Sequence, residues 1–189
     1  HIIRNYAKIW LNYNTDRLIM IRIGQGIDVH AFYDKSEESD GYDSESSQFV
    51  TLAGVQIEHS HSLLAHSDGD VVLHALADAL LGTLGLGDIG QHFPDTDDAN
   101  AGLDSRVLLR HVYSLIQQKG YKLVNADITV ACERPKLAKH NLAMRTNIAA
   151  DLETDVDNIS VKATTTEKLG FVGRQEGILA SAVVLVTND

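Results

Sequence analysis

An apolar segment with helical spacing, residues 69–84, most limits what this chain can fold into, because it needs other elements on which to pack. Ser67 and Asp70 precede it with the spacing of a capping box, and a glycine-rich segment follows it. We therefore predict a helix over residues 69–84 with one buried apolar face. That face comprises Leu73, Leu76, Ala77, Leu80 and Leu84.

Segments of β-strand character alternate with further helical segments along the rest of the chain. We predict helices over residues 103–119 and 141–153 and loops over residues 85–97 and 166–176. The chain has 189 residues, 44% of them apolar, with neither an internal repeat nor a linker. This pattern predicts a single α/β (α+β) domain. The predicted strands cover residues 20–32, two short pieces of 49–58 around Gly54, 125–133, 159–165 and 177–187.

Composition excludes several classes of protein. The net charge of −10 argues against a nucleic-acid partner. Half of that charge comes from residues 34–48, which carry six acids and one lysine and are predicted to be a flexible acidic loop. No apolar run is long enough to span a membrane, and Cys132 is the only cysteine. We therefore expect a soluble protein in a reducing, cytoplasmic setting.

The first nineteen residues resemble neither a secretory signal nor a transit peptide. Met20 is a plausible natural start, so we interpret residues 1–19 as added or upstream sequence and residues 20–189 as the domain.

A carboxylate and two histidines form a candidate metal site. Asp28 and His30 are two residues apart in a predicted strand, so their side chains point to the same face. His74 lies in the second turn of the predicted helix, between Asp70 and Asp78, either of which could hold its ring. Two histidines and one aspartate with an open fourth position suit catalytic zinc or Fe(II). The spacing alone is equally consistent with ordinary histidines at the edge of the core.

Three long motifs resemble the 2-C-methyl-D-erythritol 2,4-cyclodiphosphate synthase family. They are RIGQGIDVHAF (22–32), AHSDGDVVLHALADALLGTLGLGDIGQHFPDTD (65–97) and KATTTEKLGFVGRQEGI (162–178). The resemblance extends from about residue 20 to the end. The acidic stretch 34–48 is longer than usual for the family and overlaps none of the motifs.

The resemblance implies a fold, a reaction and metal ions. The implied fold is a mixed four-stranded sheet, covered by helices on one face, with a short hairpin. The implied enzyme is a lyase that cyclises 4-diphosphocytidyl-2-C-methyl-D-erythritol 2-phosphate and releases CMP. Zinc is assigned to Asp28, His30 and His74, and a second cation, Mg²⁺ or Mn²⁺, to Glu167.

The resemblance also assigns individual roles. His66 and Thr165 are assigned to stabilisation of the transition state. Cys132 and Arg134 stand where small residues are common in the family. The assigned substrate contacts are Asp28, Val29, His30, His66, Ser67, Asp88, Ile89, Gly90, Phe93, Pro94, Asp95, Thr96, Asp97, Cys132, Lys136, Leu137, Thr164, Thr165, Thr166, Glu167, Phe171 and Arg174.

Members of the family are homotrimers in which the sheets face the three-fold axis and the active sites lie between subunits. The resemblance also implies a bacterial, cytoplasmic enzyme. It further implies an isoprenoid diphosphate as a ligand of the central channel of the trimer, near Arg174 and Glu176. Two other classes remain open. One is a metal-binding protein with a closed structural site, and the other is a zinc-dependent phosphohydrolase that uses Asp70 as its base.

Overall fold

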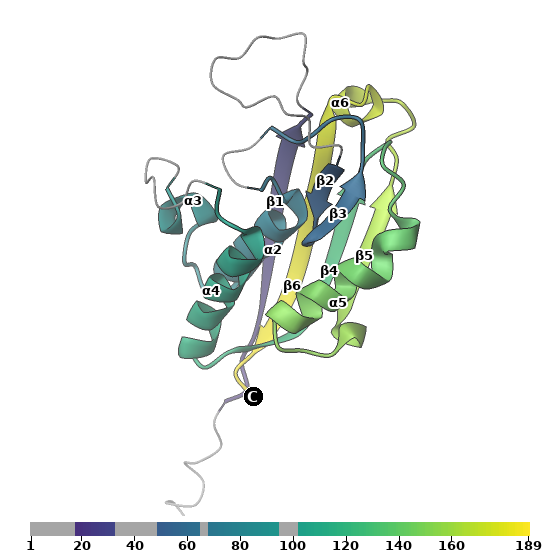
Figure 1. Cartoon of the computed structure of the whole chain (residues 1–189). Coiled ribbons are helices and arrows are strands. Elements are labelled where there is room, and N and C mark those ends of the chain that lie inside the picture. The colour runs from purple at the N-terminus through teal and green to yellow at the C-terminus, as the bar shows by residue number, and fades with distance from the viewer. Residues whose placement is uncertain (1–17, 33–48, 65–67, 95–101) are drawn as a thin grey trace, which may run out of the picture.

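The computed structural model describes residues 18–32, 49–64, 68–94 and 102–189. The acidic stretch 34–48 and residues 1–17 of the predicted leading segment lie outside these ranges. The described chain forms one four-stranded sheet and one hairpin, with its helices on one side of the sheet (Figure 1). In the part of the chain that is described, no helix is long and apolar enough to cross a membrane.

The sheet is mixed, as the resemblance implies. Its strands lie in the order β1 (Ile21–Ala31), β6 (Gly177–Thr187), β4 (Lys122–Ala131) and β5 (Ile159–Thr164). The pair β4–β5 is parallel and the other two pairs are antiparallel. Strand β1 therefore forms one edge of the sheet, and β5 forms the other.

The two short extended pieces around Gly54 form a hairpin, as predicted. Strands β2 (Phe49–Leu52) and β3 (Val55–Glu58) pair antiparallel across a two-residue turn. Both turn residues, Ala53 and Gly54, have positive φ, at 50° and 69°. That conformation matches the right-handed twist of the two strands.

Helix α2 (Val71–Thr83) packs against β1 and β6 on one side and against α4 (Ser105–Gln118) on the other. The prediction of a single buried face is therefore too narrow. Every residue of the helix is buried except Asp78 and Gly82, because sheet and helix enclose it from both sides. Leu84, predicted to belong to the buried face, lies just beyond the helix and is only half-buried.

The start of α2 differs from the predicted capping box. The helix begins at Val71, and its N-cap is Asp70, whose carboxylate accepts hydrogen bonds from the backbone N–H groups of Val72 and Leu73. Ser67 lies outside the described residues. Aspartate is a good cap because its oxygen satisfies N–H groups that have no partner within the helix.

The predicted loops contain short helices. Helix α3 (Ile89–His92) follows α2, and α6 (Gly170–Gly173) precedes β6. Helix α5 (Asn141–Asp151) packs against β5, between the 3₁₀ turns η2 (Ala138–His140) and η3 (Val156–Asn158). Elements of three or four residues are too short to show an apolar period, so the sequence pattern does not reveal them.

Two glycines let α2 lie directly on β1. A Cβ atom at Gly24 would lie 1.9 Å from the Ala79 carbonyl oxygen, and one at Gly26 would lie 2.1 Å from that of Ala75. Both obstructing atoms belong to the helix backbone, which cannot move aside alone. These glycines therefore set the separation of the two elements that carry the candidate metal ligands.

We expect Gly26→Ala to destabilise the protein by more than ~3 kcal/mol, because the added methyl group must push the helix off the strand. Gly82→Ala is the matched control, since a Cβ there meets only the Gln25 carbonyl oxygen at 3.7 Å. The control should be neutral or gain up to ~1 kcal/mol of helix stability. Chemical denaturation of both variants checks this, and equal midpoints would contradict it.

Candidate metal and substrate site

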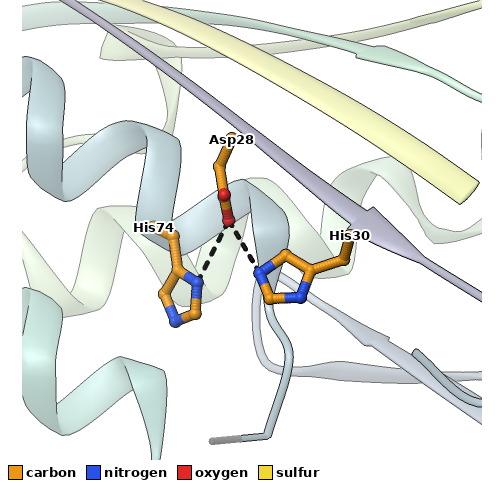
Figure 2. Close-up of side chains that lie close together, drawn as sticks. All are labelled: Asp28, His30 and His74. Atoms are coloured by element: carbon orange, nitrogen blue, oxygen red, sulfur yellow. Dashed lines mark hydrogen bonds and ion pairs between the residues drawn. The ribbon is translucent and has the colours of Figure 1, made fainter. Parts of the chain in front are cut away.

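Three ligating side chains meet between β1 and α2. Asp28 and His30 project from β1 toward α2, and His74 projects from the fourth residue of the helix (Figure 2). The alternation of the strand confirms the predicted common face, since Ile27 and Val29 lie on the exposed face.

The three side chains are close enough to share one ion. Asp28 Oδ2 lies 3.0 Å from His30 Nε2 and 3.1 Å from His74 Nδ1. One ligating atom from each residue lies within 4.8 Å of the other two. The structure thus favours a metal site over the reading of two unrelated histidines.

The outward nitrogen of His30 is held by the backbone. His30 Nδ1 lies 3.1 Å from the carbonyl oxygen of Leu64, which only accepts hydrogen bonds. A proton on Nδ1 leaves Nε2 of the neutral ring with its lone pair directed toward Asp28. A carboxylate and an unprotonated imidazole nitrogen directed at one point need a cation or a proton between them, and this donor set fits a divalent cation.

The pKa values of Asp28 and His30 also indicate that the cluster favours added positive charge. Burial by itself raises the pKa of Asp28, but its interactions with the His30 and His74 rings outweigh it and bring the pKa below its ordinary range. Burial lowers the pKa of His30, but the hydrogen bond and charge of Asp28 outweigh it and raise this pKa. The Asp28 carboxylate therefore favours a positive charge beside it, supplied either by a proton on a histidine ring or by a metal ion.

The two aspartates predicted to hold the His74 ring are used elsewhere. Asp70 is fully buried and accepts hydrogen bonds from Ala53 N and Gly54 N in addition to its capping bonds. Burial raises its pKa to about 6, against the effect of these hydrogen bonds. Asp78 accepts from Ile89 N and so ties α3 to α2. Helical spacing places Asp70, His74 and Asp78 in one stripe, but it does not show which other groups contact their side chains.

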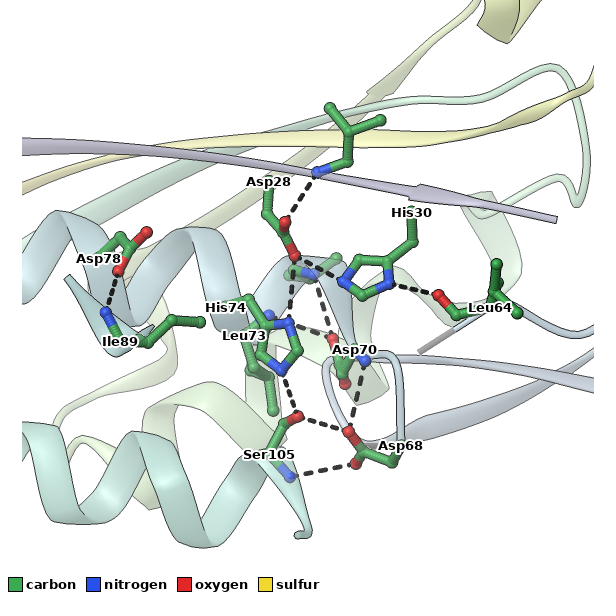
Figure 3. A network of polar contacts seen from close by, with 12 residues as sticks. Asp28, His30, Leu64, Asp68, Asp70, Leu73, His74, Asp78, Ile89 and Ser105 are labelled. Atoms are coloured by element: carbon green, nitrogen blue, oxygen red, sulfur yellow. Dashed lines mark hydrogen bonds and ion pairs between the residues drawn. The ribbon is translucent and has the colours of Figure 1, made fainter. Parts of the chain in front are cut away.

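Ser105 and Asp68 are the neighbours of His74 that sequence reasoning missed. His74 Nε2 lies 2.9 Å from Ser105 Oγ, and that hydroxyl donates to Asp68 (Figure 3). Ser105 is distant from His74 in sequence, so no local spacing indicates the contact.

The predicted sugar-binding residues lie beside α3. Asp88 caps this helix, accepting from Gln91 N at 3.1 Å and Gln91 Nε2 at 3.0 Å. Asp78, one helical turn beyond His74, accepts a hydrogen bond from Ile89 N at 2.8 Å and so holds the first residue of α3 against α2. Phe93 is half-buried, edge-on to His111, and Pro94 is exposed. The remaining predicted residues of this half, His66, Ser67, Asp95, Thr96 and Asp97, lie outside the described residues.

A second group of predicted site residues gathers where the parallel strands β4 and β5 end. Cys132 N donates to Thr164 O at 3.0 Å, which joins the two segments that follow these strands. Glu133, which the sequence did not single out, accepts from Thr166 N and Lys168 N, both at 3.3 Å. The segment carrying the threonines is thus anchored by a carboxylate from the segment that follows β4.

Glu167 is exposed and has a positive φ of 54°. Thr165 Oγ1 donates to its carboxylate at 3.2 Å. A left-handed backbone is uncommon for glutamate and often marks a functional turn. Cys132 itself is buried, which raises its pKa to about 11, so its thiol stays protonated and unreactive near neutral pH.

Two hollows flank the segment that follows β4. One, of about 410 Å³, is walled by Leu137, Ala138, Asn141, Met144, Val161 and Ala163. The other, also of about 410 Å³, has the cations Arg134, Lys136 and Lys139 among its lining residues. The apolar hollow, with one amide in its wall, suits a flat heterocycle.

The two groups of predicted site residues are not brought together within one chain. Asp28 and His30 of the metal cluster are on β1 at one edge, and Thr164 is on β5 at the other. Three strand intervals separate these edges, which is about 14 Å at the usual strand spacing. Phe171 and Arg174 belong to the segment of α6, where exposed Arg174 forms a two-point ion pair with Glu176.

Comparisons with known proteins define the class. The model of the YgbB family matches residues 21–187, so the chain belongs to this family. It is 75% identical to the 2-C-methyl-D-erythritol 2,4-cyclodiphosphate synthase of Psychrobacter arcticus, over 89% of this chain and 96% of that one. It is 68% identical to the synthase of the same name from Acinetobacter baumannii (strain SDF), over 89% and 98% of the two chains.

Solved structures agree. The CDP complex of IspF from Plasmodium falciparum matches with a TM-score of 0.72 and 37% identity, over 88% of this chain and 95% of that one. The bifunctional IspDF of Campylobacter jejuni matches with a TM-score of 0.80 and 44% identity, over 89% of this chain and 42% of that longer one. The predicted family is thus confirmed.

The metal assignment predicts a specific loss. His30→Ala or His74→Ala should lower the affinity for Zn²⁺ by more than about 100-fold, since loss of a ligand exceeds the effect of losing an outer hydrogen-bond partner. Calorimetric titration of Zn²⁺ into metal-free protein measures this. His61→Ala, an exposed histidine outside the cluster, should bind as the parent does. Unchanged affinity in the two cluster variants would show that the ion binds elsewhere.

Proposed function

We propose that this protein cyclises 4-diphosphocytidyl-2-C-methyl-D-erythritol 2-phosphate to 2-C-methyl-D-erythritol 2,4-cyclodiphosphate and releases CMP, in isoprenoid precursor synthesis. The observation that carries the proposal is the convergence of Asp28, His30 and His74 in a chain of this family. The 2-phosphate attacks the β-phosphorus, and the bond from that phosphorus to the CMP oxygen breaks. The nucleophile belongs to the substrate, so the protein needs only to fold the substrate and offset its charge.

Two cations complete the proposal. Asp28, His30 and His74 would hold Zn²⁺, and Glu167 would help to hold Mg²⁺ or Mn²⁺. Ions bound by these residues would supply Lewis-acid polarisation and neutralise phosphate charge. An acidic chain with net charge −10 otherwise repels a substrate that carries three phosphates.

The remaining residues position the substrate. Asp88 and its neighbours in α3 bind the sugar hydroxyls, as acceptors suit a polyol. The base lies in the hollow walled by Leu137 and Ala163, with Lys136, which lines the other hollow, near the phosphates. Thr165, supported through the loop that Glu133 holds, stabilises the transition state together with His66.

We propose further that each site forms between two subunits of a homotrimer. The distance between the two sheet edges supports this, since one chain keeps its metal half and its nucleotide half apart. A cyclic head-to-tail assembly places unlike halves together at every contact.

The uncovered face of the sheet supports the same assembly. Opposite the helices it presents exposed apolar side chains, with Ile23 69% and Ile27 59% exposed, joined by Val29 and Val183. Such an apolar face on a monomer marks an interaction surface. We propose that the three sheets face the axis and that the Arg174–Glu176 pair lies near a channel that accepts an isoprenoid diphosphate. We also place the enzyme in the bacterial cytoplasm.

The two other classes fit less well. A phosphohydrolase would need a base beside the metal, but Asp70 is fully buried and its oxygens accept backbone hydrogen bonds. A closed structural zinc site has four protein ligands, whereas three meet among the described residues.

The reaction itself is tested with purified protein, substrate, Zn²⁺ and Mg²⁺. We expect CMP and the cyclic diphosphate in equal amounts, identified by ³¹P NMR, and no turnover with His74→Ala. CMP appearing with an open-chain bisphosphate would instead identify a hydrolase, because water rather than the 2-phosphate would then have attacked.

Mixed trimers test the shared site. His74→Ala protein and a Lys136→Ala, Thr165→Ala protein are each expected to be inactive, but trimers co-expressed from both should regain activity. Random assembly pairs an intact metal half with an intact nucleotide half in about a quarter of the sites. Activity close to that fraction of the parent checks the model. If purified mixed trimers stay inactive, each chain holds a whole site.

A further inference from the structure

A directed pair of hydrogen bonds lies on the far side of His74 from Asp28. His74 Nε2 lies 2.9 Å from Ser105 Oγ, and Ser105 Oγ donates to Asp68 Oδ1 (Figure 3). The backbone N–H of Ser105 donates to the other oxygen of the same carboxylate, Asp68 Oδ2, at 3.2 Å. Both ends of the Asp68 carboxylate are therefore fixed against the first residue of α4.

Counting hydrogens gives the direction of these bonds. An ionised carboxylate only accepts, so the single hydroxyl hydrogen of Ser105 points to Asp68. Ser105 Oγ then has only lone pairs to offer to His74, and the proton of that contact has to be on Nε2. In the neutral ring this leaves Nδ1 unprotonated, and Nδ1 is the atom that faces Asp28 at 3.1 Å.

The packing holds this arrangement in place. Ser105 is fully buried and begins α4, whose N-cap is the preceding Asp104. Helix α4 packs along α2, so the serine is held against the ring by two helices. His74 is itself only 7% exposed, which leaves little room for its ring to turn.

We propose that Ser105 and Asp68 are positioning residues for the metal site. They fix the His74 ring in the tautomer that presents Nδ1 to the cation, and the charge of Asp68, relayed through the hydroxyl, makes that nitrogen a stronger ligand. This inference rests on the proposed metal-binding function. His30 receives the corresponding support from the Leu64 carbonyl, so only the His74 side depends on replaceable side chains.

The test uses Zn²⁺ and metal-free protein with ¹⁵N-labelled histidines. Ser105→Ala should weaken Zn²⁺ binding by about 10- to 100-fold in competition with a chromophoric chelator. In the zinc-loaded protein, the His74 Nε2–H proton should lose its hydrogen-bonded chemical shift and exchange faster with water. Ser114→Ala is the matched control, a serine of the same helix whose hydroxyl donates to the His111 carbonyl. It should change neither measurement.

Asp68→Ala provides a second variant if the buried serine does not tolerate replacement, since Asp68 is exposed. Without its acceptor, the Ser105 hydroxyl is free to donate to Nε2, so zinc affinity should fall although the serine remains. Folded variants that keep parental zinc affinity and an unchanged Nε2–H signal overturn the inference. A parent protein that binds no zinc overturns the metal site and the inference together. Intact zinc binding without cyclisation overturns only the proposed function.

Discussion

The close approach of α2 to β1 is the constraint on which the rest of the site depends. Gly24 and Gly26 leave no side chain between the strand and the helix backbone, so the two elements lie in direct contact. Asp28 and His30 continue on the same face of the strand, and Asp28 Oδ2 lies 3.1 Å from His74 Nδ1 of the helix. A bulkier strand would hold the helix farther away and separate the ligands. The glycines thus contribute to the metal site without taking part in its chemistry.

The polar groups around the cluster limit the orientations that its two histidine rings can adopt. A backbone carbonyl holds the outward nitrogen of His30, and a serine–aspartate pair holds that of His74. The nearby Asp70 carboxylate accepts hydrogen bonds from the hairpin turn and from the start of α2, so it does not compete for the ion. The buried contacts, His74 with Ser105 and Asp70 with Ala53 N and Val72 N, are costly to break, because an unpaired buried polar group loses its hydration without compensation.

Only one face of the sheet is covered by helices, and this asymmetry relates fold to assembly. The helices cover the face that carries the metal ligands, while isoleucines and valines remain exposed on the opposite face. Strand order also separates the metal half from the nucleotide half. Both features are the ones that the proposed trimer would use, because further copies of the chain would bury the apolar face and bring unlike halves together. Burial of that face would supply much of the energy of association.

The sequence by itself determined the strands, the three long helices, the common face of Asp28 and His30, and the family. Periodicity and long motifs are properties of neighbouring residues, so they can be read along the chain. The cap at Asp70, the short helices and the partners of His74 and Thr166 were decided only by the tertiary structure. Ser105 reaches His74 because α4 packs on α2, and Glu133 reaches the threonine segment because β4 and β5 are parallel neighbours. Such contacts join residues far apart in sequence, and their hydrogen bonds depend on packing that no local pattern encodes.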